Sequence, residues 1–279
     1  MTGQTVSALI RGVRNSLTPS EMRVIEVLLE DYPVAGLGSV ADLAHRAHVS
    51  APTVVRLVNK IGFTTYADFR DQLKTELSQR LFNPSDNFPA VMPGSSETLP
   101  DLERVYIESI RRTLSGIGPD LDRLVALLID TDRPVFITGG WSSSVVAQHL
   151  ANYLNLLRSD VEFIAPERGH RSRALLSIDE TSLVVILDYR RYQPDTVEFG
   201  QRARRRGASI ALLTDPALSP LAPDADVVLA TSVAGPPPFD SLTCAFMVAE
   251  TIIGLAAARL GAPGHDRLAD FERWLADEV

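Results

Sequence analysis

Residues 134–150, PVFITGGWSSSVVAQHL, decide how the larger part of this chain folds. The run VFIT is short, apolar and rich in β-branched residues, as in a buried strand, and the run that follows the serines has the apolar spacing of a helix. Between them, Gly139 and Gly140 permit a tight turn, while the serines at 142–144 offer hydroxyls and backbone amides at a helix start. Such a turn either holds an anion or simply joins a strand to a helix, and taken alone it is compatible with both.

The same alternation continues toward the C-terminus. Four more apolar runs, VEFIA, SLVVILD, SIALLTD and DVVLAT, are separated by segments of helical length such as DTVEFGQRARRRG. Continuous apolar strands that alternate with helices are typical of a parallel sheet covered on both faces. We therefore predict an α/β doubly wound parallel five-stranded sheet, preceded by helices in DLERVYIESIRRTL and DLDRLVALLID. The apolar helix expected over residues 241–260 is predicted to pack on a partner chain.

The N-terminal part has a different pattern. Three short segments with helical apolar spacing, residues 20–31, 39–47 and 50–62, predict an all-α domain, because short helices need one another to form a core. Ser39 and Asp42 have the spacing of a capping box, with Asp in place of the preferred Glu.

Between the two parts lies a stretch of linker composition. Residues 83–100, NPSDNFPAVMPGSSETLP, hold four prolines and no sustained apolar period. A chain of 279 residues is also long enough for two domains. The sequence thus predicts a helical domain over residues 1–82, a linker over 83–100 and the α/β domain over 101–279.

The net charge of −8 argues against a nucleic-acid partner only until it is divided along the chain. Residues 1–82 carry 9 Lys and Arg against 8 Asp and Glu, so the excess of acid lies in the C-terminal part. Between residues 46 and 74, five basic residues stand against two acidic ones, which allows a locally basic surface on the N-terminal domain.

The remaining composition indicates the cytoplasm. The N-terminus lacks the pattern of a secretory signal, and no apolar run approaches the roughly 20 residues that span a bilayer. The single cysteine, Cys244, lies in an apolar stretch and is expected to be a buried small side chain rather than a catalytic thiol. His45 and His48 have no Cys or further His close by, so no metal and no other cofactor is expected.

Residues 39–47 and 50–62, joined by a turn at His48 and Val49, have the lengths of a helix-turn-helix. The period of the second helix turns inward its apolar residues Val54, Leu57 or Val58, and Ile61. Arg can bond a guanine, Asn an adenine and Lys a phosphate, while a Ser that caps the helix presents backbone amides to a phosphate. The candidate DNA-contacting residues are Ser50, Thr53, Arg56, Asn59 and Lys60. A three-helix interaction module with a solvated polar face fits the same periodicity and remains an alternative.

A resemblance narrows this choice. LTPSEMRVIEVLL and SVADLAHRAHVSAPTVVRLVNKIGFTTYADFRDQL strongly resemble the N-terminal domain of the RpiR/MurR family of bacterial transcriptional regulators, over roughly residues 17–77. The residues that carry it are Ser50, Val55, Arg56, Lys60, Gly62, Phe63, Tyr66 and Phe69. The resemblance implies a DNA-binding domain that works as a dimer on an inverted or direct repeat, with the helix from Ser50 to Ile61 in the major groove.

In a doubly wound sheet of strand order 2-1-3-4-5, ligands bind beyond the carboxyl ends of the first and third strands. The two loops at those ends are TGGWSSS and LDYRRYQPDT. The candidate effector-binding residues from these loops are Gly140, Trp141, Ser142, Ser143, Arg190, Arg191 and Tyr192.

Residues 101 to about 261 resemble the SIS (sugar isomerase) domain of the same family, through VFITGGWSSSVVAQHLANYL, RARRRGASIALLTD and SPLAPDADVVL. In that family the two loops usually supply serines and threonines that surround a phosphosugar. Here Trp141 replaces a usual glycine, and Arg190, Arg191, Tyr192 and Gln193 replace a run of Ser, Gly, an acid and Thr. Because arginines bring fixed charge and forked donors, we expect an anionic effector, a phosphosugar or a carboxylate. A neutral or aromatic ligand, or a module that only dimerises, remains an alternative.

A sugar-phosphate isomerase is the rival class, and it needs a positioned base, usually Glu, and an acid, often His. Glu167 and His170 stand near the expected crevice without a pairing motif, so no enzyme is predicted. The neighbouring Arg168, Arg171 and Arg173 are expected to form a solvated face. The sequence predicts a cytoplasmic transcriptional regulator that binds a double-stranded DNA operator and a small effector, as a homodimer or a dimer of dimers, without a membrane.

Overall fold

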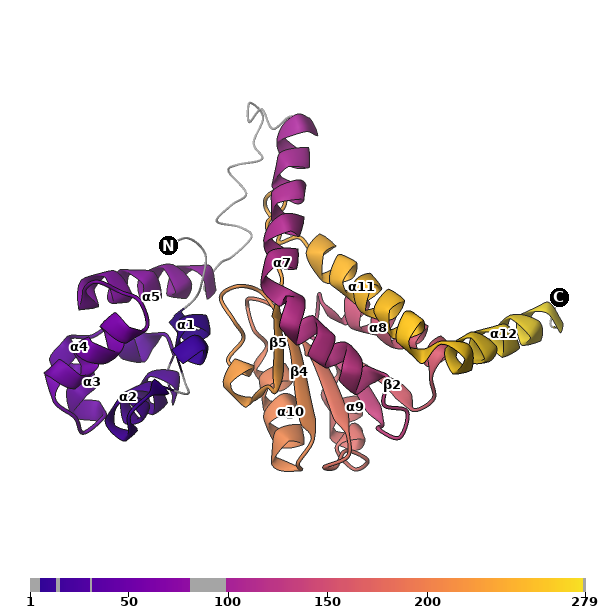
Figure 1. The fold of residues 1–279 in the computed structure, drawn as a ribbon, viewed down its shortest axis with the longest axis horizontal. Helices are drawn as coiled ribbons and strands as arrows, with labels where there is room; N and C mark the ends of the chain where they lie inside the picture. Colours follow the sequence, from indigo (N-terminus) through magenta and orange to yellow (C-terminus); the bar gives the residue numbers. More distant parts are fainter. Residues whose placement is uncertain (1–5, 14–15, 31, 81–98, 278–279) are drawn as a thin grey trace. The chain divides into compact units, whose positions relative to one another are not determined.

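The computed structural model describes residues 6–13, 16–30, 32–80 and 99–277 (Figure 1). The predicted linker lies outside the described residues up to residue 98. The predicted domain boundaries therefore stay a prediction. The chain falls into two compact units, of which the first holds residues 1–82 and 216–223 and the second holds residues 83–215 and 224–279.

The regular structure described for the first unit is entirely helical, as predicted. Its elements are α1 (Val6–Val13), α2 (Pro19–Glu30), the 3-10 turn η2 (Val34–Gly36), α3 (Val40–Arg46), α4 (Ala51–Lys60) and α5 (Tyr66–Arg80). Each of the five α-helices contributes buried apolar side chains to one core, among them Ile10, Leu28, Leu43, Leu57 and Phe69. None of these short helices buries enough surface alone, so packing against the others stabilises each of them.

The start of α3 confirms the predicted capping box. The Asp42 amide donates to Ser39 Oγ at 3.1 Å, and the Ser39 amide donates to Asp42 Oδ2 at 3.0 Å. Hydrogen bonds from Ser39 lower the pKa of Asp42. After α3 the chain turns at His48, whose φ of 51° is left-handed, and α4 begins three residues later. His48 on this turn and His45 in the last turn of α3 are both exposed.

The second unit is built on a five-stranded parallel sheet of order β2-β1-β3-β4-β5, which confirms the predicted topology. Its strands are β1 (Val135–Gly139), β2 (Val161–Ile164), β3 (Leu183–Leu187), β4 (Ser209–Thr214) and β5 (Val227–Ala230). Every residue of β1 and β3 is buried, as expected for central strands that are covered on both faces. The strand order reverses between β1 and β3.

Helices cover both faces of this sheet (Figure 1). On one face α8 (Ser144–Leu157) packs against β1 and β2, α7 (Leu99–Leu128) packs against β5, and α11 (Thr243–Leu260) packs on both helices. On the other face lie α9 (Arg168–Ala174), against β2, and α10 (Pro194–Arg205), against β3 and β4. The 3-10 turn η4 (Ala222–Asp224) precedes β5, and α12 (Ala262–Asp277) follows α11.

The two helices predicted before the sheet are one helix of 30 residues, α7. Gly116, Gly118 and Pro119 lie between the two predicted helices, where they disfavour a continuous helix because proline removes a hydrogen-bond donor and glycine is a weak helix former. Pro119 instead lies inside the helix. Burial of Ile117, Leu124 and Leu128 against the sheet core outweighs the local preference. Figure 1 shows α7 changing direction along its length.

The apolar helix α11 is only partly buried. Cys244 is 2% exposed, which confirms the expectation of a buried side chain. Only about a third of the helix is buried inside the unit, and by length and composition alone it would be suited to cross a membrane, contrary to the sequence expectation. Core helices of soluble proteins meet the same criterion, so this is weak evidence for a span.

A buried arginine joins the ends of α7 and α8. Arg158 is 2% exposed, and its guanidinium donates to the carbonyl oxygens of Leu128, Asp130 and Arg133 at 2.5–2.7 Å. These are carbonyls at and just beyond the end of α7, where helix geometry supplies no donor. Burial lowers the pKa of Arg158, and the nearby Asp160 and Asp130 act against that shift. Arg158 thus holds the segment that connects α7 to β1 in place.

Candidate functional site

Helix α4 presents the candidate DNA-contacting residues on only part of its surface. Val54, Leu57, Val58 and Ile61 are buried, as predicted. Arg56 and Asn59 are exposed. Thr53 is only 7% exposed, so its predicted outward orientation was wrong. Thr53 precedes Leu57 by four residues, which places both on the same face of the helix.

Ser50 stands at the N-cap position of α4 but caps it differently from the prediction. Its side chain makes no hydrogen bond to a helix amide. Its hydroxyl instead lies 2.9 Å from Thr53 Oγ1, which Arg56 Nη2 also approaches at 3.4 Å. The exposed Ser50 therefore leaves the first amides of α4 without a side-chain acceptor from that residue.

Lys60 serves the helical unit itself. Its Nζ donates to the carbonyl oxygen of Ser16 at 2.5 Å and to Glu21 Oε2 at 3.0 Å. Burial alone would raise the pKa of Glu21, but hydrogen bonds from Thr18 and Lys60 outweigh it, so that the pKa is lowered. The predicted phosphate contact by Lys60 would have to compete with this ion pair.

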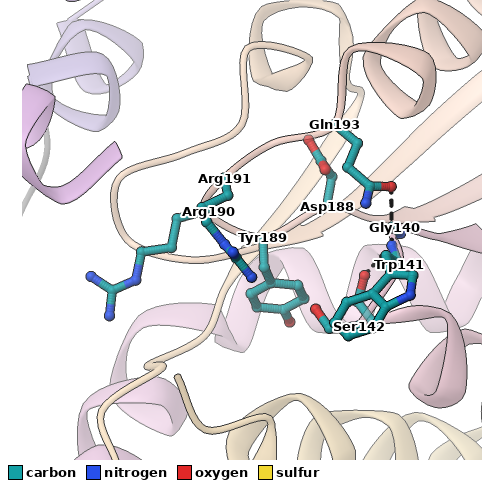
Figure 2. A pocket seen from close by; sticks show the side chains of 9 residues that line it. Gly140, Trp141, Ser142, Asp188, Tyr189, Arg190, Arg191 and Gln193 are labelled. Atoms are coloured by element: carbon teal, nitrogen blue, oxygen red, sulfur yellow. Dashed lines mark hydrogen bonds between the residues drawn. The ribbon is translucent and has the colours of Figure 1, made fainter. Parts of the chain in front are cut away.

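The second unit has a pocket of about 280 Å³ where β1 and β3 end. Figure 2 shows Arg190 and Arg191 on one side of it, and Trp141, Ser142 and Gln193 on the other. The lining residues are Gly140, Trp141, Ser142, Ser143, Asp188, Tyr189, Arg190, Arg191 and Gln193. The structure therefore brings together six of the seven candidate effector residues, and Tyr192 is the one that does not line the pocket.

The first loop is shaped by close backbone contacts. A Cβ at Gly139 would lie 2.7 Å from the Ser144 nitrogen, so only glycine fits there. The Gly140 amide donates to the Leu187 carbonyl at 3.0 Å and approaches Ser143 Oγ at 2.9 Å. Ser143 Oγ in turn donates to the Leu187 carbonyl at 2.6 Å and is 1% exposed. Ser143 thus fastens the loop to β3, although it was predicted as a ligand contact.

The second loop is held by two carboxylates. The Arg190 amide and the Tyr192 hydroxyl donate to Asp215, at 2.6 Å and 3.0 Å. This bond to the buried end of β4 explains why Tyr192 does not reach the pocket. The Arg190 guanidinium forms a two-pronged ion pair with Asp240, with Nε 2.7 Å from Oδ2. Arg191 is exposed, has a left-handed φ of 65° and forms no ion pair among the described residues.

Three lining residues were missed by the sequence analysis. Asp188 is 1% exposed. Tyr189 is 8% exposed, and its hydroxyl lies 2.9 Å from Thr231 Oγ1, while burial raises the pKa of this phenol. Gln193 accepts a hydrogen bond from the Trp141 amide through Oε1 at 3.0 Å (Figure 2). All three belong to the quoted second loop, but its side-chain directions could not be read from the sequence.

Arg171 also departs from expectation. Arg168 and Arg173 are exposed, as predicted, but Arg171 is 3% exposed. Its Nη2 donates to the Gly139 carbonyl at 2.8 Å and to Thr196 Oγ1 at 2.9 Å. Burial lowers the pKa of this guanidinium, and the acids Asp195, Asp188 and Glu167 act against the shift. A buried cation therefore links the end of β1 to the first turn of α10, behind the pocket.

The candidate isomerase pair lies elsewhere. Glu167, at the N-cap position of α9, and His170, in its first turn, are exposed, with 3.4 Å between Oε2 and Nδ1. Neither lines the pocket. Within the part of the chain that the structure describes, no three His, Cys, Asp or Glu side chains are grouped to hold a metal ion.

Comparisons with known proteins agree with both units. Residues 4–80 match the helix-turn-helix domain of the rpiR family, and residues 127–254 match the SIS domain. The transcriptional regulator HexR of Pseudomonas aeruginosa is 30% identical over 75% of this chain and 72% of its own length. HexR of Escherichia coli is 28% identical over 78% of this chain and 74% of its own length.

Two solved structures share the fold. The sugar isomerase domain of an RpiR transcription factor from Sphaerobacter thermophilus is 26% identical, with a TM-score of 0.56, over 63% of this chain and 99% of that one. The NanR protein of Vibrio vulnificus, solved in complex with ManNAc-6P, is 18% identical, with a TM-score of 0.55, over 98% of each chain.

Proposed function

Since this chain belongs to the RpiR family of helix-turn-helix transcriptional regulators that carry a SIS domain, we propose that a small anionic metabolite binds its second unit and changes its affinity for a DNA operator. The observation that carries the proposal is the pocket at the ends of β1 and β3. It combines the guanidinium groups of Arg190 and Arg191 with the hydroxyl of Ser142. Guanidinium groups suit carboxylate and phosphate oxygens through paired, charge-assisted hydrogen bonds.

We propose Arg56 and Asn59 as the residues of α4 that read bases, because both are exposed on the helix that follows the turn. Ser50 is exposed at the start of α4, where it and the first amides can approach a phosphate. Lys60 remains a candidate phosphate contact, in exchange with Glu21. Thr53 is not part of this proposal.

The organisation of the chain completes the proposal. The DNA-binding domain covers residues 1–82, the linker 83–100 and the effector domain 101–279. Two copies act together in the cytoplasm, as a homodimer or a dimer of dimers, and no membrane is involved. Effector binding shifts the arrangement of the two effector domains and thereby the spacing of the two DNA-reading helices.

The protein senses its ligand without transforming it. An isomerase would need a base and an acid at the bound sugar, and the pair Glu167 and His170 lies outside the pocket lining. Turnover of a sugar phosphate by the wild type that is lost in Glu167→Gln would contradict this part of the proposal.

A thermal-shift screen of phosphosugars and small carboxylates against the full chain tests the sensing role. A ligand that binds the folded state raises the melting temperature. At a concentration 100 times its Kd it adds about 2.7 kcal/mol to the free energy of unfolding. The same ligand should change operator affinity in a gel-shift assay, and Arg191→Ala should lose that response while it keeps DNA binding. An effector response that survives Arg191→Ala unchanged would place the ligand elsewhere.

A further inference from the structure

Two of the donors that would meet a ligand in the pocket, the Trp141 amide and the Arg190 guanidinium, already bond to other parts of the chain. The Trp141 amide, at the turn that leads into α8, is bonded to the side-chain oxygen of Gln193 at 3.0 Å (Figure 2). Gln193 is the first residue before α10, and its side chain makes no capping bond to that helix. Its amide therefore reaches across the pocket, from the second loop to the first, rather than stabilising its own helix.

The Arg190 guanidinium is engaged in the same way. Asp240 meets it with both carboxylate oxygens, which is the geometry that a bound carboxylate or phosphate would use. Both side chains are largely shielded from water, with 17% and 26% of their surfaces exposed. A charged ligand group can use the Nε–Nη2 side of this guanidinium only when Asp240 leaves it.

We propose that Gln193 and Asp240 are built-in competitors of the effector, which occupy the positions of two ligand oxygens. The inference rests on the proposed function, because it assumes that the pocket takes an anionic ligand. The Gln193 oxygen stands in for a neutral or charged acceptor at the Trp141 amide, and the Asp240 carboxylate stands in for an anion at Arg190. A ligand that satisfies both positions carries at least two acceptor groups, one of them anionic.

The two internal contacts, made by Gln193 and Asp240, determine both how tightly the pocket binds a ligand and which ligands it prefers. A ligand that offers only one acceptor leaves the other internal contact in place, whereas one that offers two gains both donors. The cost of displacing the internal groups lowers the apparent affinity for every ligand, so that simple anions such as phosphate bind only weakly.

Displacement of Asp240 should also move the segment that leads into the partly exposed helix α11. Asp240 lies three residues before the start of α11, in the segment that connects β5 to this helix. Ser241, next to it, bonds to the Val233 carbonyl and to Thr243 in the first turn of α11. The pocket is thus joined to α8 through Trp141 and to α11 through Asp240.

Inorganic phosphate is the probe for this inference. The chain has two tryptophans, so Trp274→Phe leaves Trp141, at the rim of the pocket, as the sole indole reporter. In that background and with the full chain, phosphate binding is measured by fluorescence and by calorimetry for Gln193→Ala, for Asp240→Asn and for Asp122→Asn. The last variant is the charge-matched control, because Asp122 pairs with Arg259 on α11 and does not line the pocket.

Gln193→Ala and Asp240→Asn should each bind phosphate about tenfold more tightly than the parent, the usual effect of removing one competing hydrogen bond or charge. Asp122→Asn should leave the affinity unchanged. Equal affinities in the parent, Gln193→Ala and Asp240→Asn would overturn the inference, as would an equal gain in Asp122→Asn. If Asp240→Asn fails to fold, the Gln193→Ala comparison decides alone.

This result is separable from that of the proposed function. If the wild-type screen finds an effector that changes operator binding but the variants bind phosphate with unchanged affinity, the proposed function stands. Only the inference that Gln193 and Asp240 compete with the effector would then be wrong. Absence of any anionic ligand and of any phosphate binding, even in Gln193→Ala, would overturn both.

Discussion

At the scale of single residues, Arg56 is the exposed side chain of α4 on which the proposed recognition of DNA bases most depends. Its neighbours Val55 and Asn59 share the exposed surface, but only Arg56 and Asn59 carry groups that recognise base edges. The contact from Arg56 Nη2 to Thr53 Oγ1 is 3.4 Å long, so it offers little resistance to a rearrangement on DNA.

Arg56→Ala should weaken operator binding by about 1–3 kcal/mol if the guanidinium reads a guanine. A gel-shift titration at fixed salt measures this, with Arg23→Ala on α2 as the matched control, since Arg23 is exposed and bonded only to Ser20 in the described structure. Unchanged affinity in Arg56→Ala, or an equal loss in Arg23→Ala, contradicts the assignment of α4 as the reading helix.

Arg158 is the residue on which the second unit should depend most. Its removal leaves several carbonyl oxygens near the end of α7 without their donor, in a region that water does not reach easily. We expect Arg158→Ala to lower the free energy of unfolding by about 3–5 kcal/mol, as for a broken buried charged network. Arg173→Ala, which removes an exposed arginine 3.5 Å from Glu162, should change it by at most about 0.5 kcal/mol.

Urea unfolding combined with hydrogen exchange of the amides in α7 and α8 measures both variants. Protection of these amides that is equal in Arg158→Ala and the wild type would show that water replaces the guanidinium at little cost.

At the scale of the elements, α2 and α4 are joined by an interaction that depends on pH. Glu21 accepts from the Thr18 amide at 2.8 Å at the start of α2 and from Lys60 of α4 at 3.0 Å. Thr18 thus caps the helix, since its hydroxyl also accepts from the Glu21 amide at 3.3 Å. Since the pKa of Glu21 is lowered in the folded state, the carboxylate stabilises that state above its unfolded pKa of about 4.3, and the gain is lost as the pH falls through the folded value.

Glu21→Gln should therefore destabilise the helical unit at pH 7 by about 1 kcal/mol, the usual cost of a lost helix cap. The difference from the wild type should shrink as the pH is lowered from about 5 to 3, because the wild type then loses the same charge. Urea unfolding followed by circular dichroism at both ends of this range tests it. Asp71→Asn, which removes an exposed partner of Lys74, is the control and should have a small effect at either pH. A difference for Glu21→Gln that stays constant with pH would contradict the electrostatic explanation.

The elements also show what a sequence can and cannot predict. The strands followed from five separate apolar runs, because strands that are buried on both faces are apolar throughout. Their order was taken from the usual order of doubly wound sheets, and the structure has the same order. The two loops of the pocket followed from that order. The pairing of Trp141 with Gln193 spans 52 residues and that of Arg190 with Asp240 spans 50, and no local periodicity encodes such contacts. Thr53 was misplaced because the helical period was taken to turn it outward, although it precedes the buried Leu57 by four residues and so shares its face of the helix.

At the scale of the whole molecule, a ligand in the pocket can affect the DNA-reading helices by changing how two copies of the chain pair. The surface of α8 is a candidate for that pairing. Val145, His149 and Tyr153 follow one another at intervals of four residues, so they lie along one side of α8, and Trp141 at the pocket rim stands in the turn that leads into this helix. Trp141, Val145 and Tyr153 are exposed, and the His149 ring contacts those of Tyr153 and of Phe246 on α11. A row of exposed apolar groups beside the partly buried α11 is typical of a surface that another protein covers.

If this row is the dimer surface, Tyr153→Asp should shift the full chain from dimer to monomer in sedimentation velocity, because an unpaired charge in an interface is costly. Leu176→Asp is the matched control: Leu176 is 81% exposed, follows α9 on the other face of the sheet, and should keep the dimer. The monomeric variant should also bind an operator with two half-sites about 10²-fold or more weakly, since two linked copies gain effective concentration at the second half-site. If Tyr153→Asp keeps the mass of the wild type in sedimentation, the dimer surface does not include this side of α8. If the variant is monomeric but binds the operator as tightly as the wild type, DNA recognition does not depend on dimerisation.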